Sequence, residues 1–245
     1  MSIPAHFKSM AETVKLTGHF GLIAGLPGAG KTWLLRTIPN LSRCLVMNFE
    51  HGLRSVADVE GVQVATYTRV TRKSHTDTTP SFEADLDWLE REGAGQYDFI
   101  FIDTLSELMD LVMNECGADE KDYFKPYRFV NKKMSLYLGK LRALPMSVIC
   151  TAGISRNIDT DLMEIAAPGS KLSSKIPHSF DFVAALQTQA DDTGNIKRRL
   201  QLQPGHPWAF CKARDPHNRL AQFEAADLGA LFTKLQEDQS NDRSQ

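Results

Sequence analysis

Eight consecutive residues have the types and spacing of a phosphate-binding loop. They read Gly25-Leu26-Pro27-Gly28-Ala29-Gly30-Lys31-Thr32 and fill every fixed position of the pattern G-x-x-x-x-G-K-[ST]. Glycines in such a loop let successive backbone N–H groups turn inward and cradle phosphate oxygens. The lysine then reaches the β- and γ-phosphates, and the threonine hydroxyl binds Mg²⁺. We expect nucleotide contacts from Gly25, Pro27, Gly28, Ala29, Gly30, Lys31, Thr32 and Trp33.

A phosphate loop of this kind needs an acidic residue that holds Mg²⁺ from the end of a buried strand. Asp103 directly follows the apolar run 97–102, which is typical of such a strand. The carboxyl ends of parallel strands meet at one edge of a sheet, and ligands bind at that edge. Thr32 and Asp103 are therefore the predicted metal-binding residues.

Hydrolysis also needs a group that orients or deprotonates water. Glu50 follows the second apolar run, 44–49, so it is expected at the same sheet edge. Glu107 is the alternative, but it lies one helical turn beyond Asp103 and is expected to face away. We therefore interpret Glu50 as the catalytic base and Lys31 as the residue that stabilises the transferring phosphoryl group.

The elements that must position these residues alternate between strands and helices. Strands are predicted at 19–24, 44–49, 62–66, 97–102 and 146–151, and helices at 33–38, 82–92, 105–114 and 126–144. Residues 153–179 are predicted to be loop-like. Antiparallel strands at 182–187, 196–203 and 208–213 and a helix at 227–235 follow. This order predicts an α/β fold with a mostly parallel central sheet, flanking helices and antiparallel C-terminal strands.

Composition is that of a globular domain. The 245 residues are 42% hydrophobic and 24% charged, with a formal net charge of −2, so any nucleic-acid contact must come from a local patch. We expect one domain at 18–236, a lead-in at 1–17 and a disordered polar tail at 237–245. No signal peptide or membrane-spanning run is evident, so we expect no membrane partner. Four unpaired cysteines favour a reducing, cytoplasmic location.

The order of these motifs resembles the RecA-like P-loop ATPase core over about residues 18–215. The resemblance is carried by the glycine loop, by Asn48-Phe49-Glu50-His51-Gly52-Leu53 and by Ile102-Asp103-Thr104-Leu105-Ser106-Glu107-Leu108. It implies ATP and Mg²⁺ as cofactors, with Glu50 in the position of the glutamate that activates water. Thr151 falls where that family has a residue that senses the γ-phosphate, commonly glutamine, so the resemblance adds Thr151 to the nucleotide-binding residues.

A late basic pair also resembles this family. Lys212 and Arg214, in Phe210-Cys211-Lys212-Ala213-Arg214, look like the basic-x-basic fingers that RecA and DnaB-type helicases insert into the ATP site of a neighbouring subunit. Alternate residues of a strand share a face, so both side chains can point the same way. The resemblance implies a homo-oligomer, either ring or filament, with ATP sites at the subunit interfaces. The alternative is a pair of solvent-facing basic residues on an edge strand.

The whole pattern is similar to small RecA-like ATPases of bacteriophages and prophages, which are associated with single-strand annealing and homologous recombination. Residues 153–179 correspond to the loops that face nucleic acid in RecA-like proteins. Arg156, Lys171 and Lys175 are therefore the expected contacts to single-stranded DNA, although Asp159, Asp161 and Glu164 offset their charge. A single-strand DNA-binding protein is a further candidate partner, and the host bacterial cytoplasm is the implied location.

Two other functions compete with a DNA-stimulated ATPase. A nucleotide-gated scaffold or loader would use the same site with slow turnover. A small-molecule kinase usually carries an arginine-rich lid over its acceptor, whereas residues 153–179 contain only Arg156. The kinase is therefore disfavoured, and the scaffold stays open.

Overall fold

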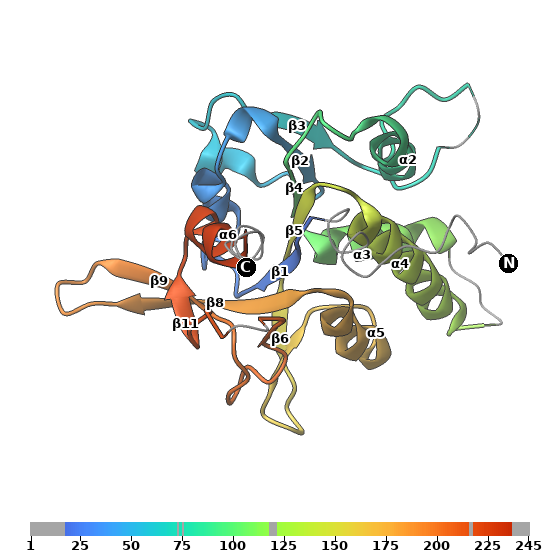
Figure 1. The fold of residues 1–245 in the computed structure, drawn as a ribbon. Helices are drawn as coiled ribbons and strands as arrows, with labels where there is room; N and C mark the ends of the chain where they lie inside the picture. The colour runs from blue at the N-terminus through green and yellow to red at the C-terminus, as the bar shows by residue number, and fades with distance from the viewer. Residues whose placement is uncertain (1–17, 73, 75, 118–121, 216–217, 237–245) are drawn as a thin grey trace, which may run out of the picture.

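The central feature is one large twisted sheet with helices on both faces (Figure 1). The computed structural model describes residues 18–72, 74, 76–117, 122–215 and 218–236, so the predicted lead-in and tail lie outside the described residues. The strand order is β11-β9-β8-β1-β5-β4-β2-β3, with β10 also paired to β8. The strands from β8 to β3 are mutually parallel, while β9, β10 and β11 pair antiparallel. This confirms the predicted α/β class.

The parallel strands are β1 (Phe20–Ala24), β2 (Cys44–Asn48), β3 (Gln63–Thr66), β4 (Phe99–Asp103), β5 (Ser147–Ala152) and β8 (Phe182–Ala190). The inner strands are mostly apolar, as strands covered on both faces must be, whereas β3 and the end of β8 are largely exposed. The antiparallel members are β9 (Ile196–Gln201), β10 (Lys212–Ala213) and β11 (Phe223–Ala225). Every residue of β1, β2, β4 and β5 is buried. The carboxyl ends of these strands therefore form a rigid edge on which a site can be built.

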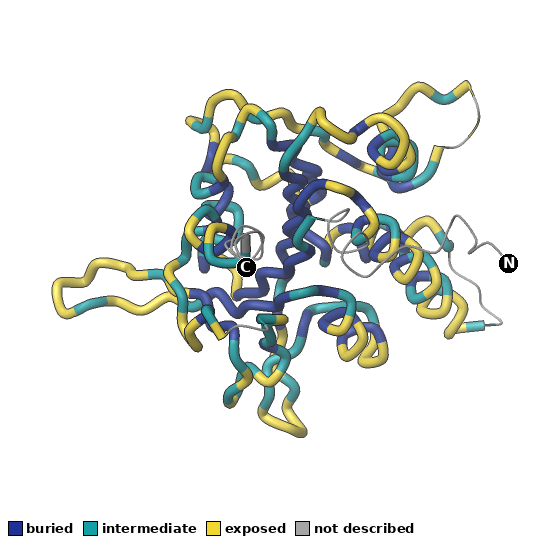
Figure 2. Tube along the Cα trace, viewed as in Figure 1, coloured by how far each residue is buried: buried dark blue, intermediate teal, exposed yellow. Residues whose placement is uncertain are grey.

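Each face of the sheet has its own apolar core (Figure 2). One core packs against α2 (Phe82–Glu92), α3 (Leu105–Cys116), α4 (Lys125–Ala143) and α5 (Ser170–Lys175). The other packs against the short 3-10 helix η1 (Thr32–Thr37) and α6 (Leu228–Gln236). The remaining 3-10 helices are η2 (Leu41–Arg43), η3 (Leu53–Val56) and η4 (Ile176–Ser179). No helix in the described part of the chain is long and apolar enough to cross a membrane.

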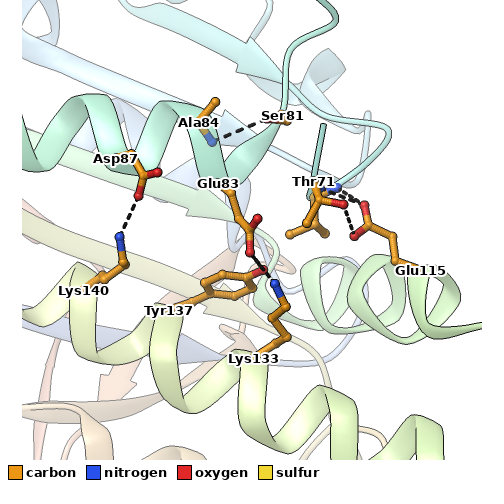
Figure 3. Close-up of polar contacts among 10 residues, drawn as sticks. Thr71, Ser81, Glu83, Ala84, Asp87, Glu115, Lys133, Tyr137 and Lys140 are labelled. Carbon is orange, nitrogen blue, oxygen red and sulfur yellow. Dashed lines mark hydrogen bonds and ion pairs between the residues drawn. The ribbon is translucent and has the colours of Figure 1, made fainter. Parts of the chain in front are cut away.

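The helices over the first core are joined by polar contacts as well as by packing (Figure 3). The Glu83 carboxylate on α2 accepts hydrogen bonds from Lys133 Nζ and Tyr137 Oη on α4, each at 2.6 Å. Glu115 on α3 accepts from the backbone N–H and the hydroxyl of Thr71, each at 2.9 Å. These contacts fix α2 and the loop before it against α3 and α4.

Three parts of the sequence prediction are wrong in detail. Residues 153–179 are not a continuous loop, because they contain the hairpin β6 (Ile154–Arg156) and β7 (Met163–Ile165) and then α5 and η4. The predicted strand 208–213 pairs only at Lys212–Ala213, since Trp208 N–H closes a turn onto the carbonyl of Gly205. β11 has no counterpart in the prediction.

The cysteines behave as predicted. All four are free thiols, and Cys44, Cys150 and Cys211 are buried. Burial raises the pKa of the Cys44 and Cys211 thiols to about 12, so both are neutral near pH 7. They contribute to the core as small apolar side chains.

Candidate nucleotide site

The predicted phosphate loop follows β1 at the carboxyl edge of the sheet. Its first residue is tied to the neighbouring strand, because Gly25 N–H donates to the carbonyl of Ala152 at 3.1 Å. Gly28 and Gly30 have φ values of +76° and +98°, which L side chains rarely adopt. Pro27 and Gly28 are exposed, while Ala29 is buried. The glycine positions thus allow the backbone turns that an anion cradle requires.

Lys31 lies across this loop. Its ammonium donates to the carbonyls of Gly25 and Leu26 at 3.1 and 3.2 Å. Burial lowers the pKa of Lys31, and the nearby carboxylates of Glu50 and Asp103 oppose that shift. The lysine charge is therefore held between the loop and two acidic strand ends.

Each carboxylate oxygen of Asp103 accepts a hydrogen bond from a threonine hydroxyl. Thr32 Oγ1 donates to Asp103 Oδ2 at 2.7 Å, and Thr151 Oγ1 donates to Asp103 Oδ1 at 2.6 Å. Asp103 and Thr151 are fully buried at the adjacent ends of β4 and β5. The structure thus brings the two predicted metal-binding residues together. It places the Thr151 hydroxyl on Asp103, so Thr151 orients that carboxylate.

Glu50 lies beyond the end of β2, which pairs with β4. Its backbone N–H donates to the carbonyl of Asp103 at 3.3 Å. Partial burial raises the pKa of Glu50, the negative charges of Asp103 and Glu107 raise it further, and Lys31 lowers it. Glu107, predicted to face away, is exposed on α3 yet close enough to act on Glu50. A carboxylate with a raised pKa is a stronger base than an ordinary glutamate.

The predicted finger residues lie away from this edge. Lys212 of β10 pairs with Val183 of β8. Arg214 N–H donates to the carbonyl of Asp181, which lies next to the amino end of β1. Asp181 N–H donates to the carbonyl of Phe20, the first residue of β1. From Phe20, β1 rises four residues, or about 13 Å, before the loop begins. Arg214 therefore cannot reach the phosphate loop of its own chain.

The two finger residues share one electrostatic environment. Arg214 Nη1 lies 3.3 Å from Asp181 Oδ1, which Arg142 also contacts at 2.7 Å. Burial lowers the pKa of Lys212, the cations Arg214 and Arg142 lower it further, and Asp181 opposes them. A cavity of about 1260 Å³ opens beside Arg142, Asp181 and Arg214. Arg142 and Arg214 thus line this hollow together with Asp181, with which both pair.

The predicted DNA contacts lie on the elements after β5. Arg156 is exposed on the β6–β7 hairpin, but its Nε donates to Asp161 at 2.6 Å. Lys171 and Lys175 are exposed on α5. The charge of Arg156 is therefore compensated within its own hairpin, and the two lysines remain the exposed basic groups of α5.

One residue at the loop was not predicted. Arg198 of β9 donates from Nε to the carbonyl of Ala29 at 3.1 Å, and its guanidinium carbon lies 5.0 Å from the centre of the Trp33 ring. The sequence shows Arg198 only as one member of the basic run 197–199. Its place at the loop depends on β8 lying beside β1, which no local pattern reveals.

The residues at this edge fit a nucleotide with Mg²⁺. No group of three or more His, Cys, Asp or Glu side chains in the described ranges could hold a metal ion unaided. Mg²⁺ is usually bound through one or two carboxylates together with substrate phosphates and water. One buried carboxylate, Asp103, beside the Thr32 hydroxyl and a glycine cradle provides that arrangement.

Comparison with known proteins decides the family. The family described as AAA domain matches residues 17–214, which include the loop, both acidic strand ends and the basic pair. The chain belongs to this family. AAA domains are P-loop ATPases, so the chain is a P-loop ATPase, and the sheet edge that carries the phosphate loop and Asp103 is its candidate nucleotide site. No curated protein matches the chain in sequence.

Among solved structures, a KaiC-like protein from the hyperthermophilic archaeon Pyrococcus horikoshii is similar to this AAA-domain chain. The two are 14% identical in sequence, with a TM-score of 0.44. The alignment covers 75% of this chain and 77% of the archaeal chain.

Proposed function

We propose that this AAA-domain protein hydrolyses ATP with Mg²⁺ at the edge built by Lys31, Thr32, Glu50 and Asp103. The carrying observation is the Asp103 carboxylate, which is buried, oriented by Thr151 and bonded to Thr32 of the loop. Thr32 and Asp103 would hold Mg²⁺, which neutralises charge on the phosphate oxygens when it is bound. Glu50 accepts a proton from the water that attacks the γ-phosphorus, and Lys31 stabilises the charge of that phosphoryl group.

The position of the basic pair supports a shared site. Arg214 lies toward the edge opposite its own loop and Lys212 lies level with the middle of β1, so both could be offered to a second copy of the chain. Fingers of this kind neutralise charge in the transition state and contribute about 10³–10⁵ in rate. We propose a head-to-tail oligomer in which each ATP site receives Lys212 and Arg214 from the neighbouring copy.

Mixing two inactive variants tests this proposal. Lys31→Ala removes the loop cation, and Arg214→Ala removes the finger. Each alone should abolish turnover, and Arg214→Ala should leave nucleotide affinity within about twofold of wild type. A mixture restores activity, because some interfaces combine an intact loop with an intact finger. Lys132→Ala, an exposed α4 change, is the matched control. Loss of nucleotide binding in dilute Arg214→Ala, or no recovery on mixing, argues against a shared site.

We further propose that the oligomer acts on single-stranded DNA in recombination or strand annealing of the phage type. Support comes from the motif resemblance and from exposed Lys171 and Lys175 on α5, an element between the parallel strands β5 and β8. Binding to phosphates by lysine is electrostatic, so it weakens as salt rises. The internal pairing of Arg156 with Asp161 makes α5 the main basic element of this region.

Phosphate release measured in parallel tests the DNA proposal. ATPase rates are compared without polymer and with single-stranded DNA, duplex DNA or RNA. Fluorescence anisotropy with a single-stranded oligonucleotide is followed across a salt series. Stimulation by single-stranded DNA together with salt-sensitive, ATP-dependent binding supports the proposal, and both effects should fall in Lys171→Ala/Lys175→Ala. Equal rates under all conditions favour the alternative, a nucleotide-gated scaffold or loader with slow turnover.

A further inference from the structure

The β8–β9 hairpin extends past the end of β1 and runs alongside the phosphate loop. β8 pairs with β1 only as far as Ala185, opposite Ala24, and then continues to Ala190. In Figure 1 this hairpin projects from the sheet beyond the other strands. Its distal half therefore has the phosphate loop of the same chain as a neighbour.

Strand alternation decides which hairpin residue faces the loop helix. Leu200 is buried in the same core as Leu34 and Leu35 of η1. Residues two apart on a strand share a face, so Arg198 lies on the η1 side, while Lys197 and Arg199 lie on the other. The guanidinium of Arg199 accordingly lies over the Phe223 ring, at 4.1 Å from its centre.

Arg198 lies against both the loop and the start of η1. Its Nε donates to the carbonyl of Ala29, and its guanidinium lies over the Trp33 ring. A Cβ built on Gly30 would lie 2.6 Å from Arg198 Nε, which is closer than real Cβ contacts come. Gly30 therefore serves two purposes, since it adopts a positive φ and leaves space for Arg198.

The two terminal nitrogens of Arg198 are available to donate hydrogen bonds to a ligand. Within the described ranges, its two terminal nitrogens form no hydrogen bond with a protein acceptor, and Arg198 forms no ion pair. A guanidinium presents its donors in a planar fork that matches phosphate oxygens, and it can keep one face on an aromatic ring while it does so. The arrangement thus combines a fixed cation, free donors and a predicted phosphate cradle.

We propose that Arg198 binds the phosphate chain of the nucleotide in cis, on its α-phosphate side, while it remains stacked on Trp33. Thr32 is committed to the metal between the β- and γ-phosphates, so the next residue, Trp33, lies toward the α-phosphate and the nucleoside. Arg198 therefore contacts the part that ADP and ATP share. This role differs from that of Lys212 and Arg214, which act on the γ-phosphate of another copy. The inference rests on the proposed nucleotide binding.

Calorimetric titration with ADP and with a non-hydrolysable ATP analogue tests the proposal. Arg198→Gln keeps an amide donor for the Ala29 carbonyl but removes the charge. It should weaken both ligands by the same factor, about 10- to 100-fold, because a charged hydrogen bond is lost. Arg198→Lys retains the charge without the planar fork and should be intermediate. Lys197→Ala, which removes a neighbouring charge from the opposite face, should bind within twofold of wild type.

The outcomes separate this inference from the proposed function. If Arg198→Gln binds ADP within twofold of wild type while Lys31→Ala loses binding, Arg198 only braces the loop and the inference is overturned. If only the ATP analogue is weakened, the contact is to the γ-phosphate and the inference is also overturned. If wild type binds neither ligand, the proposed function itself fails. Circular dichroism checks that each variant is folded. If Arg198→Gln is unfolded, the ADP affinity of Arg198→Lys is used instead, and binding within twofold of wild type overturns the inference.

Discussion

At the residue scale, the decisive group is the buried Asp103 carboxylate, whose two oxygens have different partners. One contacts Thr32 of the loop, and the other is held by Thr151. The Thr151 hydroxyl lies 2.6 Å from the Asp103 carboxylate and 3.2 Å from the carbonyl of Ile102, so it would act on a metal indirectly, through Asp103, as residues around a metal site commonly do. We therefore expect Thr151 to position Asp103 for the proposed Mg²⁺ site.

Replacing Thr151 tests this positioning role. Thr151→Val removes the hydroxyl with little change in shape and leaves Asp103 Oδ1 without its donor. The Mg²⁺ concentration that gives half-maximal ATPase activity should rise by about tenfold or more. Thr151→Ser keeps the hydroxyl and should stay within about twofold of wild type. ADP binding in the presence of EDTA should be unchanged, and a loss there would indicate direct nucleotide contact instead.

At the element scale, α2 is held on α4 by polar contacts that differ in how deeply they are buried (Figure 3). Glu83 satisfies the hydroxyl of Tyr137, which is 1% exposed, and also pairs with Lys133. Asp87 pairs with Lys140 in a more open position, and Lys140 also has Glu90 as a partner. Burial, rather than the number of ion pairs, should decide which carboxylate matters for stability.

We expect Glu83→Ala to lower the free energy of unfolding by about 1–3 kcal/mol, because it leaves a buried hydroxyl without an acceptor. Asp87→Ala, the matched surface change, should cost at most about 0.5 kcal/mol. Urea unfolding gives both values from the shift in midpoint at constant m. Equal losses in the two variants would show that the buried Tyr137 hydroxyl contributes nothing special.

At the scale of the whole molecule, the site and the proposed finger Arg214 lie toward opposite edges of one sheet. In the proposed oligomer a protomer alone has an incomplete site, so ATPase activity per chain should fall steeply on dilution below the dissociation constant of the oligomer. Turnover and molar mass measured over the same concentration series check this, since both should change together. A constant rate per chain, at concentrations where the mass is that of a monomer, would contradict it.

The parts of this structure that the sequence predicts are those set by contiguous residues. The phosphate loop and Asp103 are readable because each follows an uninterrupted apolar strand, and α2 is readable from its amphipathic spacing. Arg198 is not, because its place follows from the pairing of β8 with β1 across about 160 residues of sequence. The β6–β7 hairpin was missed since three-residue strands carry too little alternation to be recognised.

In the proposed oligomer, the opposite placement of Arg214 and the phosphate loop gives the chain a polarity, with a donor end and an acceptor end. Copies joined donor to acceptor use two different surfaces, and such contacts either close into a ring or continue as a filament. A closed ring completes one site for every copy. An open filament always has one complete site fewer than it has copies. Its shortest form, a dimer, would therefore have half the ATPase activity per chain of a closed ring. Activity per chain, plotted against assembly size, would therefore distinguish rings from filaments without an image of either.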